Sequence, residues 1–486
     1  MSISTPANSF LTEHTKCDMI KYLIQIQKGV PMKNIYIRAG MSPFESFPAE
    51  KILLNNSIGT NVGNFLYVYG ILRNITQADS VITPNHYKSS YTDAEIDTIN
   101  QTQDIFIIPL ADAFRNDFVS SLKSMTKLVK KLTIPCVIIG VGLRAPFEPD
   151  FSTPYNFDDA VKEFVCAVLE KSSMVGVRGE ITSAYLSHLG FREGTDHMAI
   201  GCPSMYTVGP QLNIRETNIT KDSRICINSS VTTPDNVHEF LDHVTKEFPD
   251  WHFVPQVLSE LRLLYTGSPY ITKCNPLYPR RITDETYRTG KSEFFLNVPT
   301  WFEYMSKADL AIGSRLHGNI AALLAGTPSI LIPKDARVRE LSEYHDLTRV
   351  NAADITAETN VWDLIHSVDF QQPCRKQEAN FNRFLSFLEK NEIPHIYQNG
   401  TPDTIPFLER MKEVPLQPPV TTFANCSLEE MSARFERFYP AYEEKLKKPA
   451  PKAKSAPQPQ KGAATETPKS TEPSKSKGLL DRLFGK

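Results

Sequence analysis

Several features that define common protein classes are missing from this sequence. Across 486 residues, no apolar run reaches the roughly 18 residues that a membrane-spanning helix needs. The first residues lack the basic start and apolar stretch of a secretory signal peptide, so we expect none. The net charge is only −2, whereas a dedicated nucleic-acid-binding protein needs a basic surface. We therefore expect a cytoplasmic protein that does not bind nucleic acid.

Cysteines are present but form no recognisable site. The eight cysteines are scattered, with no Cys-x-x-Cys pair and no cluster of His and Cys at metal-ligand spacing. Cys136, Cys202 and Cys226 lie in apolar, strand-like segments. Such positions are typical of free thiols buried in a reducing compartment. We expect neither a metal nor a disulfide framework.

The length and the composition predict a soluble protein of more than one domain. Hydrophobic residues make up 41% of the chain and charged residues 22%, which is ordinary for a globular protein. A chain of 486 residues is too long for one hydrophobic core. We therefore expect at least two large domains.

Short apolar segments alternate with amphipathic ones along most of the chain. The segments that read as strands are Ile52–Asn55, Asp104–Leu110, Cys136–Gly142, Met174–Val177, Ile225–Asn228, Phe253–Val257, Phe294–Asn297, Leu310–Gly313 and Ser329–Ile332. Strands that alternate with helices predict parallel sheets with helices on both faces. Because the strands fall into two series, we expect an α/β fold with two Rossmann-like domains facing a central cleft.

The chain is divided accordingly into five segments. We expect an N-terminal extension with a helix at Met19–Gln27, two Rossmann-like domains, a helical cover or bridge, and a disordered basic tail. Their expected ranges are 1–50, 51–215, 216–370, 371–448 and 449–486.

The tail is rich in Pro, Lys, Ala, Ser and Thr, so it buries too little apolar surface to fold. Its last residues place Leu479, Leu480, Leu483 and Phe484 on one face if they form a helix. That pattern predicts docking to a membrane surface or to a groove on a partner protein. A terminus without a role is the alternative, since isolated helices of this length are marginal in water.

The most informative stretch runs from Ala308 to Pro328. A strand ends at Gly313 and a helix of small residues follows, so Arg315 and His317 lie between the two. Ligands bind at that edge of open α/β sheets, and the helix dipole there favours anions. An arginine fork suits a carboxylate or phosphate, and a histidine can supply a proton near neutral pH. An ion pair for Arg315 and a helix cap for His317 are the plainer alternatives.

This stretch resembles the signature of the polysaccharide pyruvyl transferase family: a strand, Arg-x-His, and a small-residue helix ending in Gly-x-Pro. The segment Ser329–Asp335 is similar to the last core strand of that family. The other segments that carry the resemblance are Asn61–Asn64, which lacks an Asp often found there, Cys136–Gly142 with its final glycines, Ser173–Glu180, and Ile200–Ser204. The resemblance covers roughly residues 50–350.

The resemblance implies a GT-B-like pair of domains that transfers a pyruvyl group from phosphoenolpyruvate to a sugar of a polysaccharide or glycan precursor. It implies no cofactor besides this donor substrate. Arg178 and Arg315 match the arginines that hold the donor's anionic groups, with Leu316 beside them, and His317 matches the general acid. This match predicts two arginines that clamp a small anion and a histidine that protonates it.

Four further residues are predicted to contact substrate. Asn61 and Gly63 are expected on the acceptor side, and Gly140 and Gly142 allow the backbone to approach the ligand. All four are also common in plain turns. Arg144, directly after these glycines, is a candidate for one more anion ligand.

Two other functions remain open at this stage. A nucleotide-sugar glycosyltransferase of the same architecture would use Glu340 or Glu343 to hold a ribose. A non-catalytic scaffold would keep the fold and use the tail to recruit partners. The irregular segment 266–291 is either a lid over the acceptor or a surface insertion.

Overall fold

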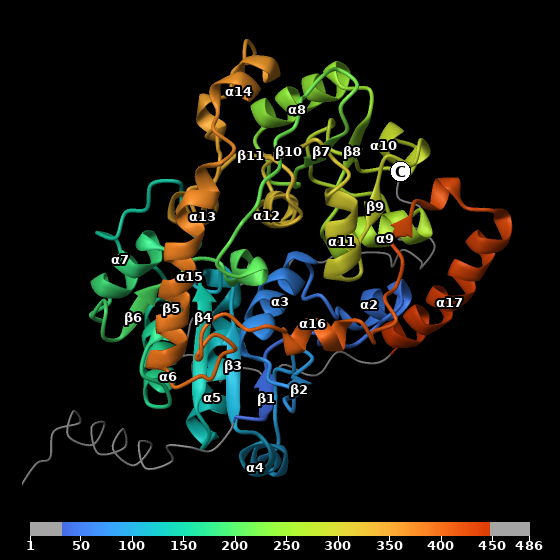
Figure 1. Ribbon diagram of the computed structural model, residues 1–486. Coiled ribbons are helices and arrows are strands. Elements are labelled where there is room, and N and C mark those ends of the chain that lie inside the picture. The colour runs from blue at the N-terminus through green and yellow to red at the C-terminus, as the bar shows by residue number, and fades with distance from the viewer. Residues whose placement is uncertain (1–31, 448–486) are drawn as a thin grey trace, which may run out of the picture. The chain divides into compact units, whose positions relative to one another are not determined.

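The computed structural model describes residues 32–447. The helix expected at Met19–Gln27 and the tail from residue 449 lie outside the described residues. From Met32 to Tyr442 the chain forms one compact unit that contains two parallel sheets (Figure 1). No helix of the described residues is long and apolar enough to cross a membrane.

The first sheet has six strands, and all its neighbouring strands are parallel. The strands are β1 (Asn34–Ile37), β2 (Val81–Pro84), β3 (Ile105–Pro109), β4 (Cys136–Val141), β5 (Val175–Val177) and β6 (His197–Ala199), in the order β2-β1-β3-β4-β5-β6. β3 and β4 are buried on both faces, which explains their uninterrupted apolar sequences. The strand order reverses between β1 and β3, where α/β sheets bind ligands.

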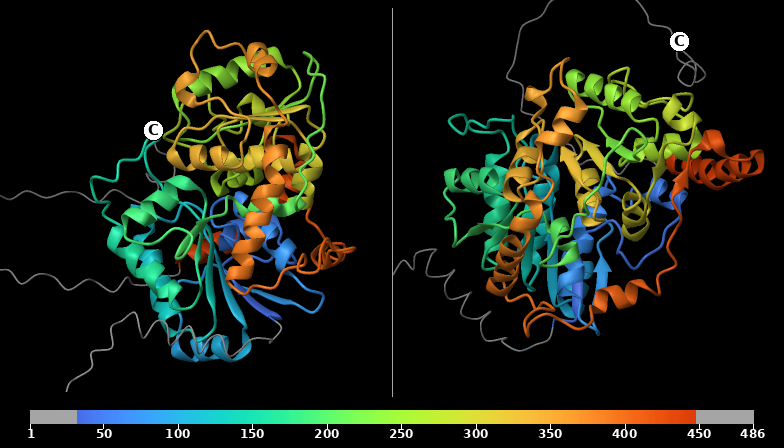
Figure 2. Two further views of the ribbon diagram at one scale, coloured as in Figure 1. Left: turned by 60° about the vertical axis from the view of Figure 1, so that its left-hand side comes forward. Right: turned by 45° about the horizontal axis from the view of Figure 1, so that its top comes forward.

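Helices cover both faces of this sheet (Figure 2). They are α2 (Ala49–Asn55), α3 (Gly63–Ile75), α4 (Asp93–Thr102), α5 (Val119–Lys131), α6 (Asp158–Leu169) and α7 (Glu180–His188). On one face, Phe106 and Ile138 pack in a core with Phe164 of α6. On the other face, Ile107 and Val137 belong to the core that includes α3. Alternating side chains of one strand therefore serve two cores.

The second sheet repeats this connectivity with four parallel strands. They are β7 (Ile225–Asn228), β8 (Trp251–Phe253), β10 (Leu310–Gly313) and β11 (Ser329–Leu331), in the order β11-β10-β7-β8. Its helices are α8 (Asp235–Glu247), α9 (Leu258–Thr266), α11 (Val298–Met305), α12 (Leu316–Leu324), α13 (Ala336–Tyr344) and α14 (Val361–Ser367). The order of this sheet reverses between β7 and β10, so the chain contains two Rossmann-like sheets, as expected.

The chain after the second sheet returns to the first one. Helix α15 (Gln372–Lys390) lies against the first sheet (Figure 1), where Phe387 packs close to Gly176 of β5. Asn391, which follows this helix, accepts a hydrogen bond from the backbone of Met174 (3.0 Å). Three shorter elements and a long helix follow: α16 (Pro406–Met411), β12 (Val420–Thr421), a 3-10 turn (Phe423–Asn425) and α17 (Leu428–Lys447). Helix α15 therefore ties the last part of the chain to the first domain.

The expected strand Ile52–Asn55 is wrong: these residues belong to helix α2. Short apolar runs fit either structure, and here only Ala49 and Ile52 of the helix are fully buried. The strand that opens the first sheet is β1, upstream of residue 51, where its four residues NIYI gave too weak a signal.

Two strands of the second half also differ from expectation. β8 ends at Phe253, because Pro255 has no backbone N–H to continue a ladder and Val257 already precedes α9. The segment Phe294–Asn297 is not a strand of the parallel sheet. Only β9 (Glu293–Phe294) pairs, antiparallel with β12, and Asn297 caps α11.

Candidate functional site

The carboxyl ends of the two sheets meet through the loop before α3. Val62 N donates to Gln256 O (2.8 Å), and Leu258 N donates to Thr60 O (3.1 Å), so this loop joins the loop after β8. Gly63 lies directly against His317 of α12. A Cβ atom at Gly63 would be 2.5 Å from His317 Nδ1, so no larger residue fits there without displacing the imidazole.

His317 is partly buried in the first turn of α12. Its Nε2 is 3.7 Å from Cys202 Sγ, and its ring centroid is 6.3 Å from that of Tyr67. Burial lowers the pKa of His317 to about 3, with help from the positive charges of Arg178 and Arg337. The imidazole is therefore neutral at neutral pH while the site holds no anion.

Arg178 follows β5 and is only 1% exposed. Its Nε donates to the carbonyl of Gly140 (2.8 Å), but its Nη2 is buried and has no partner among the described residues. Gly142 leaves room for this side chain, since a Cβ there would be 2.9 Å from Arg178 Cδ. A buried guanidinium nitrogen without a partner is costly, which indicates that it binds a ligand.

Gly140 must be glycine for a different reason from Gly142. Its φ is +78°, a left-handed conformation, and a Cβ there would be 2.8 Å from Pro203 Cδ. Close packing therefore requires glycine at both positions, and the approach of a ligand to their backbone stays a prediction.

Asp112, directly after β3, gathers three arginines. Its carboxylate is 2.8 Å from Arg115 Nη1, 2.8 Å from Arg144 Nη2 and 3.0 Å from Arg337 Nη1. Burial alone would raise the pKa of Asp112, but these charges hold it well below its usual value. Since Arg337 belongs to α13, the pair of Asp112 and Arg337 joins the two domains. Asp117 also pairs with Arg115 (2.7 Å) and Arg144 (3.7 Å), and Asp335 pairs with Arg337 (3.2 Å), so three carboxylates accompany the three guanidinium groups.

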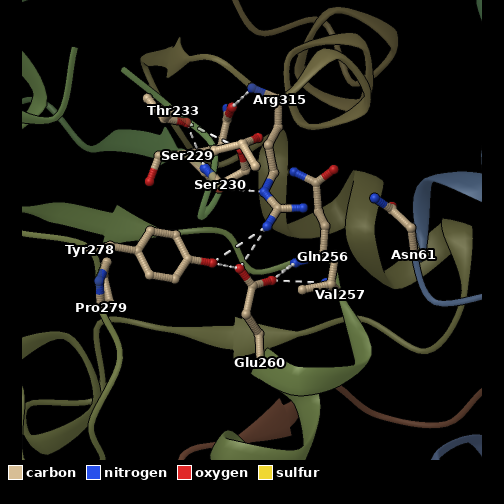
Figure 3. A network of polar contacts seen from close by, with 12 residues as sticks. Asn61, Ser229, Ser230, Thr233, Gln256, Val257, Glu260, Tyr278, Pro279 and Arg315 are labelled. Carbon is tan, nitrogen blue, oxygen red and sulfur yellow. Dashed lines mark hydrogen bonds and ion pairs between the residues drawn. The ribbon is translucent and has the colours of Figure 1, made fainter. Parts of the chain in front are cut away.

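Arg315 lies in a different environment, inside the second domain (Figure 3). Its Nη2 is 2.8 Å from Glu260 Oε1, and its Nε donates to the carbonyl of Ser229. Tyr278 donates to the same Glu260 carboxylate. Arg315 thus belongs to an ion pair, which was the plainer alternative, although the pair is buried rather than exposed.

Unpartnered donors gather at the first turn of α12. Asn228 Nδ2 and Gln256 Nε2 are buried without a hydrogen-bond partner among the described residues. Both lie close to Gly318, where a Cβ would be 2.6 Å from Gln256 Nε2 and 3.1 Å from Asn228 Nδ2. Together with the helix dipole, these donors favour an anion.

The remaining residues predicted from the sequence have local roles in the structure. Asn61 accepts a hydrogen bond from the backbone of Gly63 (2.8 Å) and so shapes the turn before α3. Leu316 begins α12 and is buried. Arg144 binds Asp112 rather than standing free.

Both glutamates considered for a ribose are already engaged. Glu340 is buried and accepts hydrogen bonds from Thr182 N (2.6 Å) and Oγ1 (2.9 Å) at the start of α7. Glu343 forms an ion pair with Arg339 (2.9 Å).

The segment 266–291 is packed on the second domain. It contains α10 (Glu285–Arg288), and its Tyr278 and Tyr287 are fully buried. Through Tyr278 this segment supports the ion pair of Arg315 and Glu260.

Sequence reasoning missed Asp112, Arg337 and the contact of Cys202 with His317. Asp112 follows β3, and Arg337 lies in the first turn of the helix after β11. The rule that selected Arg315, a polar residue between a strand and a helix, would have found both if applied to every strand.

Comparisons with known proteins were made for the whole chain. The family model of polysaccharide pyruvyl transferase matches residues 61–335. A search of the curated proteins finds no match.

Three solved structures illustrate the matches found by fold. UDP-GlcNAc 2-epimerase from Neisseria meningitidis bound to UDP-GlcNAc has 13% identity and a TM-score of 0.38, covering 74% of this chain and 100% of that chain. UDP-GlcNAc 2-epimerase from Methanocaldococcus jannaschii has 14% identity and a TM-score of 0.38, covering 73% of this chain and 100% of that chain. A glycosyltransferase from Streptomyces nogalater has 12% identity and a TM-score of 0.25, covering 85% of this chain and 100% of that chain.

Proposed function

Because the chain belongs to the polysaccharide pyruvyl transferase family, we propose that it moves a pyruvyl group from phosphoenolpyruvate to a sugar of a polysaccharide or glycan precursor. The observation that carries this proposal is Arg178 Nη2, a buried donor without a partner, on a side chain whose charge acts on His317. That combination suits a small anion that must be held next to a proton donor.

Phosphoenolpyruvate has a phosphate and a carboxylate on a three-carbon frame. In this proposal Arg178 holds one of these groups, and Arg337 adds positive charge to the same side. The unpartnered donors Asn228 Nδ2 and Gln256 Nε2, at the first turn of α12, hold the other. Arg315, whose charge is neutralised by Glu260, keeps the turn between β10 and α12 in place through this ion pair.

His317 supplies the proton in the proposed reaction. The proton goes to the methylene carbon of the donor, which becomes a methyl group, and one sugar hydroxyl adds to the neighbouring carbon. The bond from that carbon to the phosphate oxygen then breaks, phosphate leaves, and a second hydroxyl of the sugar closes the ketal. Of the two protons that the hydroxyls lose, one restores protonated His317 and the other leaves with the phosphate, so the sugar and the donor yield the ketal and inorganic phosphate.

The charge of the bound donor also explains how His317 becomes protonated. Without an anion, burial and the charges of Arg178 and Arg337 keep the imidazole neutral. The negative charges of phosphoenolpyruvate offset those of the arginines and raise the pKa of His317. Proton uptake therefore accompanies donor binding, and the general acid is charged only when its substrate is present.

The nucleotide-sugar alternative has less support. It requires a free carboxylate for a ribose, whereas Glu340 is engaged with Thr182 and Glu343 with Arg339. No specific observation on the described residues favours it.

The test is thermal unfolding with millimolar phosphoenolpyruvate or a nucleotide sugar. We expect phosphoenolpyruvate alone to stabilise the wild type, by about 2.7 kcal/mol at a hundredfold excess over Kd. Arg178→Met is expected to lose the shift. Arg192→Met, which removes an exposed arginine paired with Asp196, is the control and keeps it.

His317→Gln is expected to bind the donor but to release no phosphate in the presence of acceptor. Stabilisation by a nucleotide sugar, and not by phosphoenolpyruvate, would overturn the proposal in favour of a glycosyltransferase.

The tail 449–486 is proposed, from its sequence pattern, to dock the enzyme at a membrane surface facing the cytoplasm. Deletion of these residues is expected to abolish co-sedimentation with anionic lipid vesicles. Unchanged co-sedimentation of the truncated protein would contradict this part of the proposal.

A further inference from the structure

Lys334 is surrounded by hydroxyl groups rather than by carboxylates. Its Nζ donates to Ser230 Oγ, to Thr232 Oγ1 (3.0 Å) and to Thr233 Oγ1 (3.5 Å). Lys334 follows β11, and the three hydroxyl residues follow β7. Among residues 32–447, no carboxylate forms an ion pair with Lys334.

The hydroxyl loop is held in shape by its own hydrogen bonds. Ser230 N donates to Thr233 Oγ1 (2.9 Å), and Thr233 N donates to Ser230 O (2.9 Å). Thr233 Oγ1 is also 2.7 Å from Ser314 Oγ, at the end of β10. Figure 3 shows Ser230 and Thr233 beside Arg315.

These groups therefore lie over the carboxyl ends of the neighbouring strands β11, β10 and β7. The order of the second sheet reverses between β10 and β7, and this is where such sheets bind ligands. The cluster therefore lies where ligands bind in sheets of this kind.

The chemistry of the cluster suits a phosphate group. The hydroxyls of Ser230 and Thr232 each have an O–H that can donate to oxygen atoms of a ligand while they accept from the ammonium, whereas the hydroxyl of Thr233 is engaged with Ser314. Lysine serves as a compact point charge for phosphate. Burial lowers the pKa of Lys334 to about 7, and the charges of Arg337 and Arg315 lower it too, despite the opposite effect of Asp335. An anion is therefore favoured beside this ammonium.

We infer that Lys334, Ser230 and Thr232 form a phosphate subsite on the second domain, with Thr233 holding their loop in shape. Which molecule brings the phosphate rests on the proposed function. It is either the phosphate that the donor loses or a phosphate carried by the acceptor, as in a diphosphate-linked sugar.

Calorimetric titration with inorganic phosphate and with pyrophosphate tests the subsite. Loss of the charged hydrogen bonds of Lys334 is expected to weaken phosphate binding about tenfold to a hundredfold in Lys334→Met. Lys307→Met is the matched control, because it removes an exposed lysine paired with Glu303 (2.9 Å), and should leave the affinity unchanged.

A second variant keeps Lys334, so that a structural effect of removing this lysine is not mistaken for a loss of binding. Ser230→Ala combined with Thr232→Val keeps Lys334 and the buried contact of Thr233 with Ser314, and is expected to weaken phosphate binding severalfold. Wild-type phosphate affinity in both variants, or no binding of phosphate or pyrophosphate to the wild type at millimolar concentration, would overturn the inference.

Competition identifies the source of the phosphate. If phosphoenolpyruvate displaces inorganic phosphate, the subsite holds the donor's phosphate. If pyrophosphate and phosphoenolpyruvate bind together, it holds the acceptor's. Both results support the subsite, and both are binding measurements that need no transfer. If pyruvyl transfer fails, phosphate binding to the subsite can still be measured. Full phosphate affinity in Lys334→Met would contradict the subsite and would leave the proposed function standing.

Discussion

Two arginines follow parallel strands in this protein, and their surroundings differ. Arg178, after β5, has no carboxylate within ion-pair distance among the described residues, and its Nη2 is unpartnered. Arg315, after β10, is neutralised by Glu260, which is itself fully buried. The comparison shows that a position at the carboxyl end of a strand does not define the role of an arginine. The nearest acid decides whether its charge serves folding or a ligand.

The largest expected effect comes from breaking the ion pair of Arg315. Arg315→Met leaves the carboxylate of Glu260 buried without its partner, which costs about 3–5 kcal/mol of the free energy of unfolding. Urea unfolding measures this loss. Arg315→Met combined with Glu260→Gln should recover part of it, since the buried charge is gone. A fully stable single variant would show that water reaches Glu260 and that the two arginines are alike.

The matching change at Arg178 should act on binding rather than on stability. Arg178→Met removes a buried charge without a partner, so the free energy of unfolding is expected to stay the same or to rise. Affinity for phosphoenolpyruvate should fall about a hundredfold, which corresponds to about 2.7 kcal/mol. Calorimetric titration and urea unfolding of the same sample measure both. A loss of stability with intact donor affinity would reverse the assignment of the two arginines.

The pH dependence of stability sharpens the comparison further. The pKa of His317 is lowered from 6.5 to about 3 in the folded state, so on acidification the unfolded chain takes up a proton first. The free energy of unfolding therefore decreases as the pH falls from about 6.5 to about 3. The slope is at most about 1.4 kcal/mol per pH unit for this one group.

Arg178 lowers the pKa of His317, and Arg315 is not among the groups that shift it. Arg178→Met should therefore raise the pKa of His317, whereas the stable double variant of Arg315 and Glu260 should not. NMR titration of the imidazole signals distinguishes the two. Equal shifts in both variants would mean that Arg178 has no specific effect on the pKa of His317.

The smallest effect is expected at Cys202, whose Sγ lies 3.7 Å from His317 Nε2 and 3.2 Å from Ser204 Oγ. Cys202→Ala should lower kcat about threefold to tenfold with little change in KM, since it removes a weak hydrogen bond that orients the ring. Cys202→Ser should restore most of kcat. Cys226→Ser, a buried thiol of β7, is the control. Equal kcat in Cys202→Ala and the wild type would exclude an orienting role.

Sequence patterns predicted strands well where both faces of a strand are buried. β3 and β4 were recognised because a strand inside a parallel sheet is apolar throughout. The sequence patterns failed for the short strand β1 and for Ile52–Asn55, because four residues fit a helix and a strand equally. The same limit applies to β9, since its partner β12 lies more than a hundred residues further along the chain.

The candidate site was predicted in part for a similar reason. Arg178, His317 and their glycines stand in local motifs, so their positions at strand ends follow from the sequence. Asp112 lies in the loop after β3, Lys334 in the loop after β11 and Arg337 in the first turn of α13, and the sequence patterns assigned a role to none of them. Their proximity depends on how the two sheets meet.

By itself, the sequence determined the family, the α/β class and the strand ends at which the functional side chains lie. These follow from patterns within a few residues, because strand burial and the strand-to-helix turn are local. Only the tertiary structure decided which charges neighbour one another. Glu260 reaches Arg315, Arg337 crosses to Asp112, and Arg178 has no acid partner among the described residues, because electrostatic and hydrogen-bond partners are set by distance in space and not along the chain.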